Sequence, residues 1–91
     1  MTMESRIFRI RGKVQGVGFR AATLRQAQAL AVKGWVCNLR DGSVEVLAYG
    51  DNRQLAALRS WLEQGPAYAS VRSLAESVGQ AAEPPATFSI R

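Results

Sequence analysis

The sequence predicts an α+β sandwich, in which two helices pack on one face of a four- to five-stranded, mainly antiparallel sheet. Its 91 residues suit one compact domain. Strand-like and helix-like hydrophobic periods alternate along the chain in the order β-α-β-β-α-β. An Asp-Gly pair separates the second and third strand-like segments, and this pair is typical of a tight hairpin.

The first strand is predicted over residues 6–13, where apolar and polar side chains alternate. This period of two places Phe8 and Ile10 on the core face of the sheet. It leaves Arg9 and Arg11 on the opposite, open face, so this strand has one solvated side.

A helix is predicted over residues 21–33, which are rich in Ala, Leu, Gln and Arg. Lys33 is expected in its last turn, where a positive charge complements the helix dipole. Gly34 is expected to be the left-handed residue just past its end. The segment that connects the first strand to this helix contains several glycines.

Two further strands are predicted over residues 35–39 and 43–49, joined by the turn at Asp41 and Gly42. On the second of these strands Val44, Val46 and Ala48 are expected to face the core. Glu45 then lies on the open face, where we expect it to pair with Arg9 or Arg11.

The second helix is predicted over residues 52–64, because Asp51 and Gln54 form a capping box at its start. The remaining segments are a strand over residues 70–78, a loop over residues 81–86 and an edge strand over residues 87–91. This order is that of the ferredoxin-like βαββαβ sandwich. The fold alone does not identify a function.

The composition excludes several kinds of site. The chain has no histidine and one cysteine, so Ser-His-Asp and Cys-His catalysis, His-containing zinc sites and an intrachain disulfide are impossible. Because a small extracellular protein usually needs disulfides, we expect a cytoplasmic protein. The longest unbroken apolar runs reach only four residues, so we expect no contact with a membrane.

Basic residues are concentrated in the first half of the chain. The whole chain has 12 Lys and Arg against 7 Asp and Glu, whereas residues 1–40 hold eight basic residues against one acid, Glu4. A solvated basic face, a nucleic-acid surface and a site for a small phosphorylated ligand all fit this asymmetry.

The glycine-rich connection after the first strand indicates an anion site. It lacks the glycine and lysine spacing of the common nucleotide-binding loops. Gly16 and Gly18 nevertheless allow successive backbone N–H groups to converge on an anion. The helix that follows has no Ser, Thr, Asp or Asn at its start, so its first N–H groups lack an acceptor that a phosphate would supply. Arg20 adds a guanidinium at the same place.

Two segments of the sequence resemble the signatures of the acylphosphatases. They are residues 12–20, GKVQGVGFR, and residues 34–44, GWVCNLRDGSV. The resemblance extends over the whole chain and implies a single acylphosphatase-like domain over residues 1–91. It implies an enzyme that hydrolyses the carboxyl-phosphate bond of a small acyl phosphate, releasing a carboxylate and inorganic phosphate.

The resemblance also implies the roles of individual residues. The phosphoryl group is implied to be held by backbone amides and by the side chain of Arg20. These amides belong to Gln15, Gly16, Val17, Gly18, Phe19 and Arg20. Asn38 is implied to position the attacking water. The chain departs from the usual pattern at Cys37, where Lys, Arg or Gln is common, and at Ala31, which replaces a common glycine.

The implied chemistry agrees with the absence of histidine. A carboxylate, whose conjugate acid has a pKa of roughly 4, leaves without being protonated, so no general acid is required. Positioning and charge stabilisation dominate phosphoryl transfer, so we expect no metal and no cofactor. An amide is not a base at neutral pH, so Asn38 is expected to orient water rather than deprotonate it. We expect the enzyme to act as a monomer.

Three alternatives have less support in the sequence. An RNA-binding module of the same fold needs exposed aromatic residues on its central strands, whereas Arg9, Arg11, Glu45 and Leu47 are expected there, so we expect no nucleic-acid partner. An acylphosphatase-like domain also begins larger carbamoyl-transfer maturation proteins, but the sequence given ends at Arg91, so we expect a domain that acts by itself. Cys37 as a nucleophile lacks a nearby base and is expected to face away from Asn38.

Overall fold

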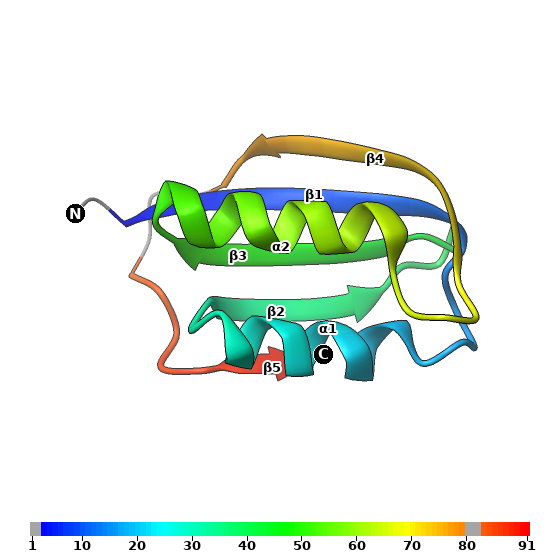
Figure 1. Cartoon of the computed structure of the whole chain (residues 1–91), viewed down its shortest axis with the longest axis horizontal. Helices are drawn as coiled ribbons and strands as arrows, with labels where there is room; N and C mark the ends of the chain where they lie inside the picture. Colours follow the sequence, from blue (N-terminus) through cyan, green and yellow to red (C-terminus); the bar gives the residue numbers. More distant parts are fainter. Residues whose placement is uncertain (1–2, 80–82) are drawn as a thin grey trace.

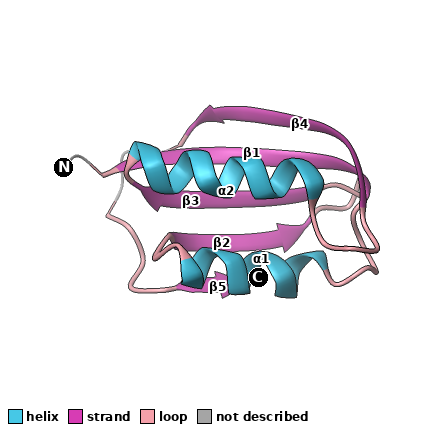
Figure 2. Ribbon diagram, viewed as in Figure 1, coloured by secondary structure: helices cyan, strands magenta, loops and turns pink. Residues whose placement is uncertain are grey.

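The structure is a computed structural model that describes residues 3–79 and 83–91. Its elements are β1 (Glu4–Lys13), α1 (Phe19–Ala29), β2 (Lys33–Asn38), β3 (Val44–Gly50), α2 (Asn52–Gln64), β4 (Ser70–Val78) and β5 (Phe88–Ile90). Both helices lie on the same face of one sheet (Figures 1 and 2). The predicted α+β sandwich is therefore confirmed.

The sheet has five strands in the order β4-β1-β3-β2-β5. Three of the four strand pairs are antiparallel, and β5 alone pairs in parallel, with β2. The connections β1–α1, β2–β3 and α2–β4 lie together at the right-hand end of the molecule in Figure 1. Chain segments that are distant in sequence therefore meet at this end of the sheet.

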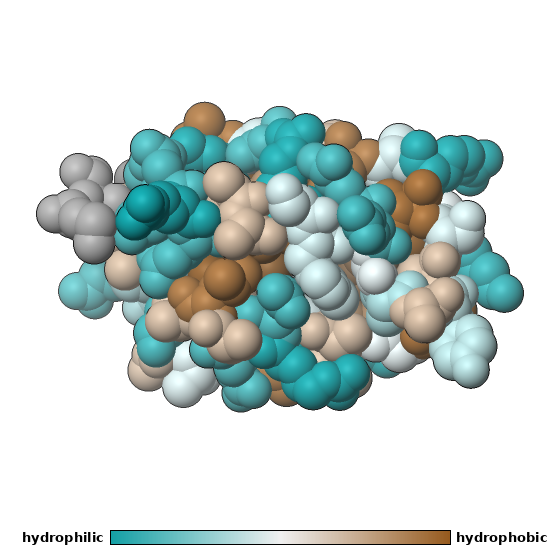
Figure 3. Space-filling view, in the orientation of Figure 1, coloured by the Kyte–Doolittle hydropathy of each residue, from teal (hydrophilic) through white to brown (hydrophobic). Residues whose placement is uncertain are grey.

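The core lies between the sheet and the two helices. The predicted inward residues of β1 and β3, Phe8, Ile10, Val44, Val46 and Ala48, are all fully buried. The second helix contributes Leu55, Leu58 and Leu62 to the same cluster. Figure 3 shows apolar surface between the two helices and mostly polar or pale surface on their outer sides. Burial of these apolar faces is the main stabilising contribution to the fold.

The open face of the sheet carries the cross-strand pair that the sequence predicts. Arg9 and Glu45 are directly opposite each other in the β1–β3 register. An Nη atom of Arg9 donates to a carboxylate oxygen of Glu45 at 2.8 Å. Part of the positive charge of the first half of the chain is thus neutralised on this face.

The predicted end of the first helix is wrong. The helix ends at Ala29, and Ala31 rather than Gly34 is the left-handed residue, with φ of 59°. The N–H of Val32 donates to the carbonyl of Ala27, and the N–H of Ala31 donates to that of Gln28. These two bonds form a Schellman motif.

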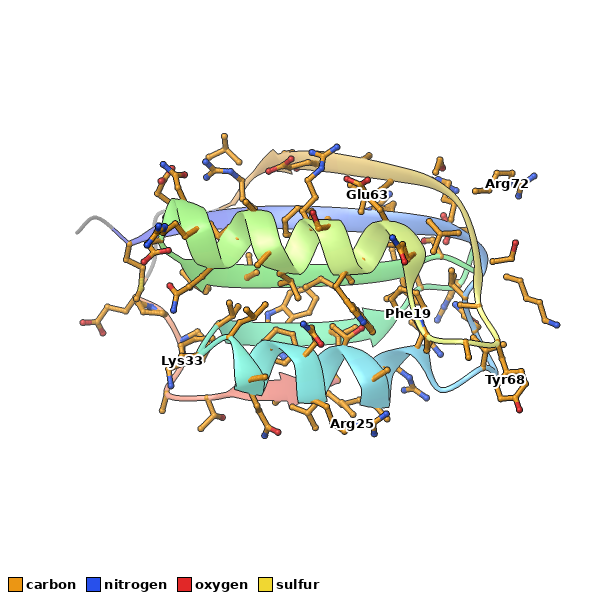
Figure 4. The ribbon with its side chains drawn as sticks, in the orientation of Figure 1. Phe19, Arg25, Lys33, Glu63, Tyr68 and Arg72 are labelled. Atoms are coloured by element: carbon orange, nitrogen blue, oxygen red, sulfur yellow. The ribbon has the colours of Figure 1, made fainter. Side chains whose placement is uncertain are left out.

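The early helix end follows from packing of the next segment. Val32 is only 2% exposed, and Lys33 already pairs with Tyr49 in the sheet. The chain therefore has to leave the helix before Val32. Lys33 lies at the start of β2 and at the opposite end of α1 from Phe19 (Figure 4).

Gly34 is required within β2 for a different reason. Its φ is 135°, and a Cβ atom there would lie 1.8 Å from the carbonyl oxygen of Leu47. A side chain does not fit into this approach between β2 and β3. Gly34 therefore allows close strand pairing rather than a helix end.

The remaining predictions concern the second half of the chain. The capping box at the start of α2 is confirmed, since Asp51 and Gln54 each accept from the other's backbone N–H. The strand over residues 70–78 is confirmed, and the edge strand at 87–91 is present as β5. In the predicted loop over residues 81–86, residues 81 and 82 lie outside the described part. Within residues 3–79 and 83–91, no helix is long and apolar enough to cross a membrane.

Candidate active site

The connection between β1 and α1 is anchored at both ends by buried side chains. Val14 is 1% exposed and Phe19 is 2% exposed. The ring of Phe19 packs against Trp61 of α2 with 5.8 Å between ring centroids, so it lies between the start of α1 and the end of α2 (Figure 4). The four residues 15–18 between these anchors form a short loop, called the phosphate loop below after the role that the sequence resemblance implies for it.

Two glycines allow the phosphate loop its tight path. Gly16 and Gly18 have φ of 74° and 78°, in the left-handed region that other residues rarely adopt. A Cβ atom at either position would meet no atom within 4 Å. Both glycines therefore face open space on their Cβ side, and both line the pocket described below.

The start of α1 supplies further free donors. Its N-cap residue is Gly18, which provides no side-chain cap, and the first turn of the helix contains no acidic residue. The first helical hydrogen bond runs from the N–H of Ala22 to the carbonyl of Gly18. The preceding N–H groups, of residues 19–21, lie at the positive end of the helix dipole. This end of the helix is suited to an anion.

A pocket of about 230 Å³ opens in front of the phosphate loop. It is lined by Val14, Gly16, Gly18, Phe19, Arg20, Ala21, Asn38 and Ile90. Four of the predicted phosphate-binding residues and the predicted water-positioning residue therefore share one cavity. Two others, Gln15 and Val17, are not part of its lining. The cavity is smaller than a typical drug-sized pocket, which starts at about 300 Å³, so it suits a small ligand.

Asn38 is the last residue of β2 and lines this pocket. Its Oδ1 is buried, and it is the one buried side-chain nitrogen or oxygen without a hydrogen-bond partner in the part of the chain that the structure describes. Buried polar atoms are almost always paired in folded proteins. Asn38 therefore carries a buried acceptor that no described protein group satisfies.

The side chain of Gln15 has a role that the sequence did not predict. Its Nε2 donates to the carbonyl oxygens of Leu39 at 2.8 Å and of Ser43 at 2.9 Å. Both acceptors belong to the turn that follows Asn38. Gln15 thus ties the phosphate loop to the hairpin that carries Asn38.

Ile90 and Ala21 are pocket residues that sequence analysis missed. Ile90 reaches the pocket because β5 pairs in parallel with β2, with Ile90 beside Val36. No local pattern predicts which strand β5 joins. The position of Ala21 depends on where α1 begins, two residues earlier than its composition predicts.

Two groups near the site have altered acidity. Burial raises the pKa of the Cys37 thiol, and the negative charge of Glu45 acts in the same direction. Cys37 lies one residue before Asn38 on β2 and so points to the opposite face of the sheet. Hydrogen bonds from the hydroxyl and then the N–H of Ser43 lower the pKa of Asp41, and Arg11 adds to this.

The chain is similar in sequence to known proteins of one family. The family model described as acylphosphatase matches residues 6–90. An acylphosphatase of Paraburkholderia xenovorans is 55% identical over 69 residues, which are 76% of this chain and 71% of that protein. One of Actinobacillus pleuropneumoniae is 44% identical over 98% of this chain and 99% of its own length.

The fold is also similar to that of a solved structure. The acylphosphatase of Coxiella burnetii has a TM-score of 0.91 and 34% sequence identity, over 98% of this chain and 93% of that one. The match of the family model over most of the chain and the extent of these similarities are decisive. The chain belongs to the acylphosphatase family, whose members are hydrolases that act on acid anhydrides.

Proposed function

We propose that this protein hydrolyses small acyl phosphates to a carboxylate and inorganic phosphate without a metal or a cofactor. The observation that carries the proposal is the shared pocket. There Asn38, whose buried Oδ1 has no hydrogen-bond partner, lines the same cavity as Arg20 and the uncapped start of α1. This arrangement combines an acceptor for water with donors for a phosphoryl group.

The phosphoryl oxygens are held by the backbone N–H groups of Gln15, Gly16, Val17, Gly18, Phe19 and Arg20. The guanidinium of Arg20 adds a planar pair of donors. Charge on the equatorial oxygens is stabilised as the bond to the acyl group loosens. The dipole of α1 acts in the same direction, because its positive end faces the loop.

The water is oriented by Asn38, whose Oδ1 accepts one of its O–H groups. The water oxygen forms a bond to phosphorus while the bond from phosphorus to the acyl oxygen breaks. The electron pair of that bond leaves with the carboxylate, and the proton of the water passes to a phosphate oxygen or to solvent. Because a carboxylate is a stable anion at neutral pH, no proton donor is needed for the leaving group.

The proposal is tested by hydrolysis of benzoyl phosphate with excess EDTA present. The wild-type protein should be active, and Arg20→Ala should lower kcat/KM by about 100-fold or more. The matched control is Arg25→Ala, which removes the same charge from an exposed position on the outer side of α1 (Figure 4). Loss of all activity with EDTA, or equal activity in the Arg20 and Arg25 variants, would contradict the proposal.

The role of Asn38 is tested separately by the split between turnover and binding. Asn38→Ala should lower kcat by about 100-fold or more while inhibition by inorganic phosphate stays nearly unchanged, because Asn38 acts on the water. Asn52→Ala, at an exposed position of α2, is the control. Equal losses in turnover and in phosphate inhibition would assign Asn38 to phosphate binding instead.

We further propose that the enzyme acts as a monomer of one domain, residues 1–91, in the cytoplasm and without a nucleic-acid partner. The single cysteine supports a reducing compartment. The Arg9–Glu45 pair on the open face of the sheet supports the absence of a nucleic-acid surface there. Light scattering of the purified protein tests the monomer, and salt-dependent binding to RNA would contradict the absence of such a partner.

A further inference from the structure

The residues that line the pocket fall into two chemically different sets. The polar set comprises the glycines of the phosphate loop, Arg20 and Asn38. The apolar lining residues are Val14, Phe19, Ala21 and Ile90. Val14 and Phe19 are 1% and 2% exposed, so they offer a ligand little surface. Ile90 is 42% exposed and is the large apolar side chain that this lining leaves accessible.

The position of Ile90 is fixed although the side chain is exposed. It lies beside Val36 in the parallel β2–β5 register. The next residue, Arg91, donates its N–H to the carbonyl of Val36 at 2.8 Å. On the opposite face of the sheet, the guanidinium of Arg91 lies 4.8 Å from the centre of the Trp35 ring. The chain is thus held at Ile90 by strand pairing and at Arg91 by these two contacts.

We propose that Ile90 is the specificity-determining residue of an acyl subsite that accepts uncharged acyl groups with an apolar substituent. The inference rests on the proposed function, because it takes the phosphoryl group to be held by the phosphate loop and Arg20. The acyl group attached to that phosphoryl group then contacts the apolar set of lining residues. Contact between the partly exposed side chain of Ile90 and an apolar acyl group removes apolar area of both from water, and this favours binding.

Ile90 contacts the acyl part of the ligand and not the phosphoryl part. Its contribution therefore appears in the affinity for whole acyl phosphates and not in the affinity for inorganic phosphate. It also grows with the apolar area of the acyl group. An aromatic acyl group should bind more tightly than an acetyl group for this reason.

The test uses two ligands that cannot be hydrolysed. In phenacylphosphonate and acetonylphosphonate a methylene group replaces the oxygen between phosphorus and the acyl carbon. Calorimetry gives their affinities and that of inorganic phosphate for each variant. The wild-type protein should bind phenacylphosphonate more tightly than acetonylphosphonate.

Ile90→Ala should lower the affinity for phenacylphosphonate about five- to tenfold and leave the affinity for inorganic phosphate within about twofold of the wild-type value. Ile90→Met, which keeps a large apolar side chain, should restore most of the loss. Val78→Ala is the matched control, because Val78 is 78% exposed on β4, at the opposite edge of the sheet. It should change none of the three affinities.

Two results would overturn the inference. An unchanged preference for phenacylphosphonate in Ile90→Ala would mean that Ile90 does not contact the acyl group. An equal loss of affinity for all three ligands would mean that Ile90 only shapes the pocket. If the wild-type protein binds the phosphonates as expected but does not hydrolyse benzoyl phosphate, the proposed function fails and the acyl subsite stands.

Discussion

The side-chain amide of Gln15 donates a hydrogen bond to the backbone carbonyl oxygen of Leu39 at 2.8 Å. A second bond runs from the same nitrogen to the carbonyl of Ser43. One amide group thus joins the phosphate loop to the turn after Asn38. The relative position of the two halves of the candidate site depends on this contact.

Replacement of Gln15 should therefore affect both stability and turnover. Gln15→Met keeps the length of the side chain but removes two hydrogen bonds, each worth about 0.5–1.5 kcal/mol in the free energy of unfolding. The carbonyl oxygens of Leu39 and Ser43 each keep one backbone donor, so neither is left unpaired. Turnover of benzoyl phosphate should also fall, because the loop is less well positioned. Urea unfolding and steady-state kinetics measure the two effects.

The control for this change is Gln28→Met, at an exposed position of α1. It should be as stable and as active as the wild-type protein. If Gln15→Met behaved in the same way as Gln28→Met, the contact between the phosphate loop and the hairpin would have no energetic importance.

Ala31 is a site where a glycine should stabilise the protein. Its φ of 59° is unfavourable for alanine by about 1–2 kcal/mol, and glycine would relieve this strain. The greater chain entropy of glycine in the unfolded state offsets part of the stabilisation. Ala31→Gly should raise the free energy of unfolding by about 0.5–1 kcal/mol, which corresponds to a Tm increase of a few degrees.

The matched control is Ala29→Gly, within the last helical turn of α1. There glycine should lower the free energy of unfolding by about 0.5–1 kcal/mol. The two variants place glycine at positions within one turn of each other, so the diagnostic result is a change in the free energy of unfolding of opposite sign. If both variants were less stable than the wild-type protein, the left-handed backbone of Ala31 would not be a source of strain.

Asp41 should make stability depend on pH in the acid range. Its pKa is lowered in the folded protein, mainly by the hydrogen bond from the Ser43 hydroxyl, so its ionised form stabilises the fold. This contribution is complete above the unfolded pKa of about 3.9 and is lost as the pH falls through the lower folded pKa. The Tm difference between wild type and Asp41→Asn should therefore be largest near neutral pH and vanish in strong acid.

Thermal unfolding followed by circular dichroism at several pH values measures this difference. Asp41→Asn should have a smaller effect when combined with Ser43→Ala, because the main cause of the pKa change is then absent. A Tm difference that stays constant from neutral pH to strong acid would show that the charge of Asp41 is not involved.

Cys37 should be slow to react and dispensable for catalysis. Burial raises the pKa of its thiol, so the reactive thiolate is scarce at neutral pH. Iodoacetamide should therefore modify it more slowly than a free cysteine derivative at pH 7, and the rate should rise in alkaline solution. Cys37→Ser should keep at least about half of the wild-type kcat. A loss of most activity in this variant would instead indicate a covalent intermediate on sulfur.

Local signals predicted those parts of the fold that depend on neighbouring residues. The capping box of Asp51 and Gln54 correctly predicted the start of α2, and the Asp41-Gly42 pair correctly predicted the hairpin. The predicted end of α1 was wrong, because the observed end depends on the burial of Val32 and on the pairing of β2 with β3. Those are long-range interactions that no local pattern contains.

The same distinction holds at the candidate site. Gly16, Gly18, Arg20 and Asn38 could be identified because each belongs to a recognisable segment, and the structure places all four around one pocket. Ile90 could not be identified, because its place depends on the parallel pairing of β5 with β2.

The strand order has a consequence for how the site is assembled. The loop after β1 and the end of β2 form one pocket, yet β3 lies between these strands in the sheet. Neither half of the site is positioned until β3 has paired on both of its edges. The β2–β3 pairing is a local hairpin, whereas the β1–β3 pairing joins residues distant in the chain, such as Arg9 and Glu45. Such distant pairings raise the contact order of the chain, a property associated with slow folding. The candidate site is thus a property of the completed sheet, and we expect ligand binding at its pocket to return late in refolding.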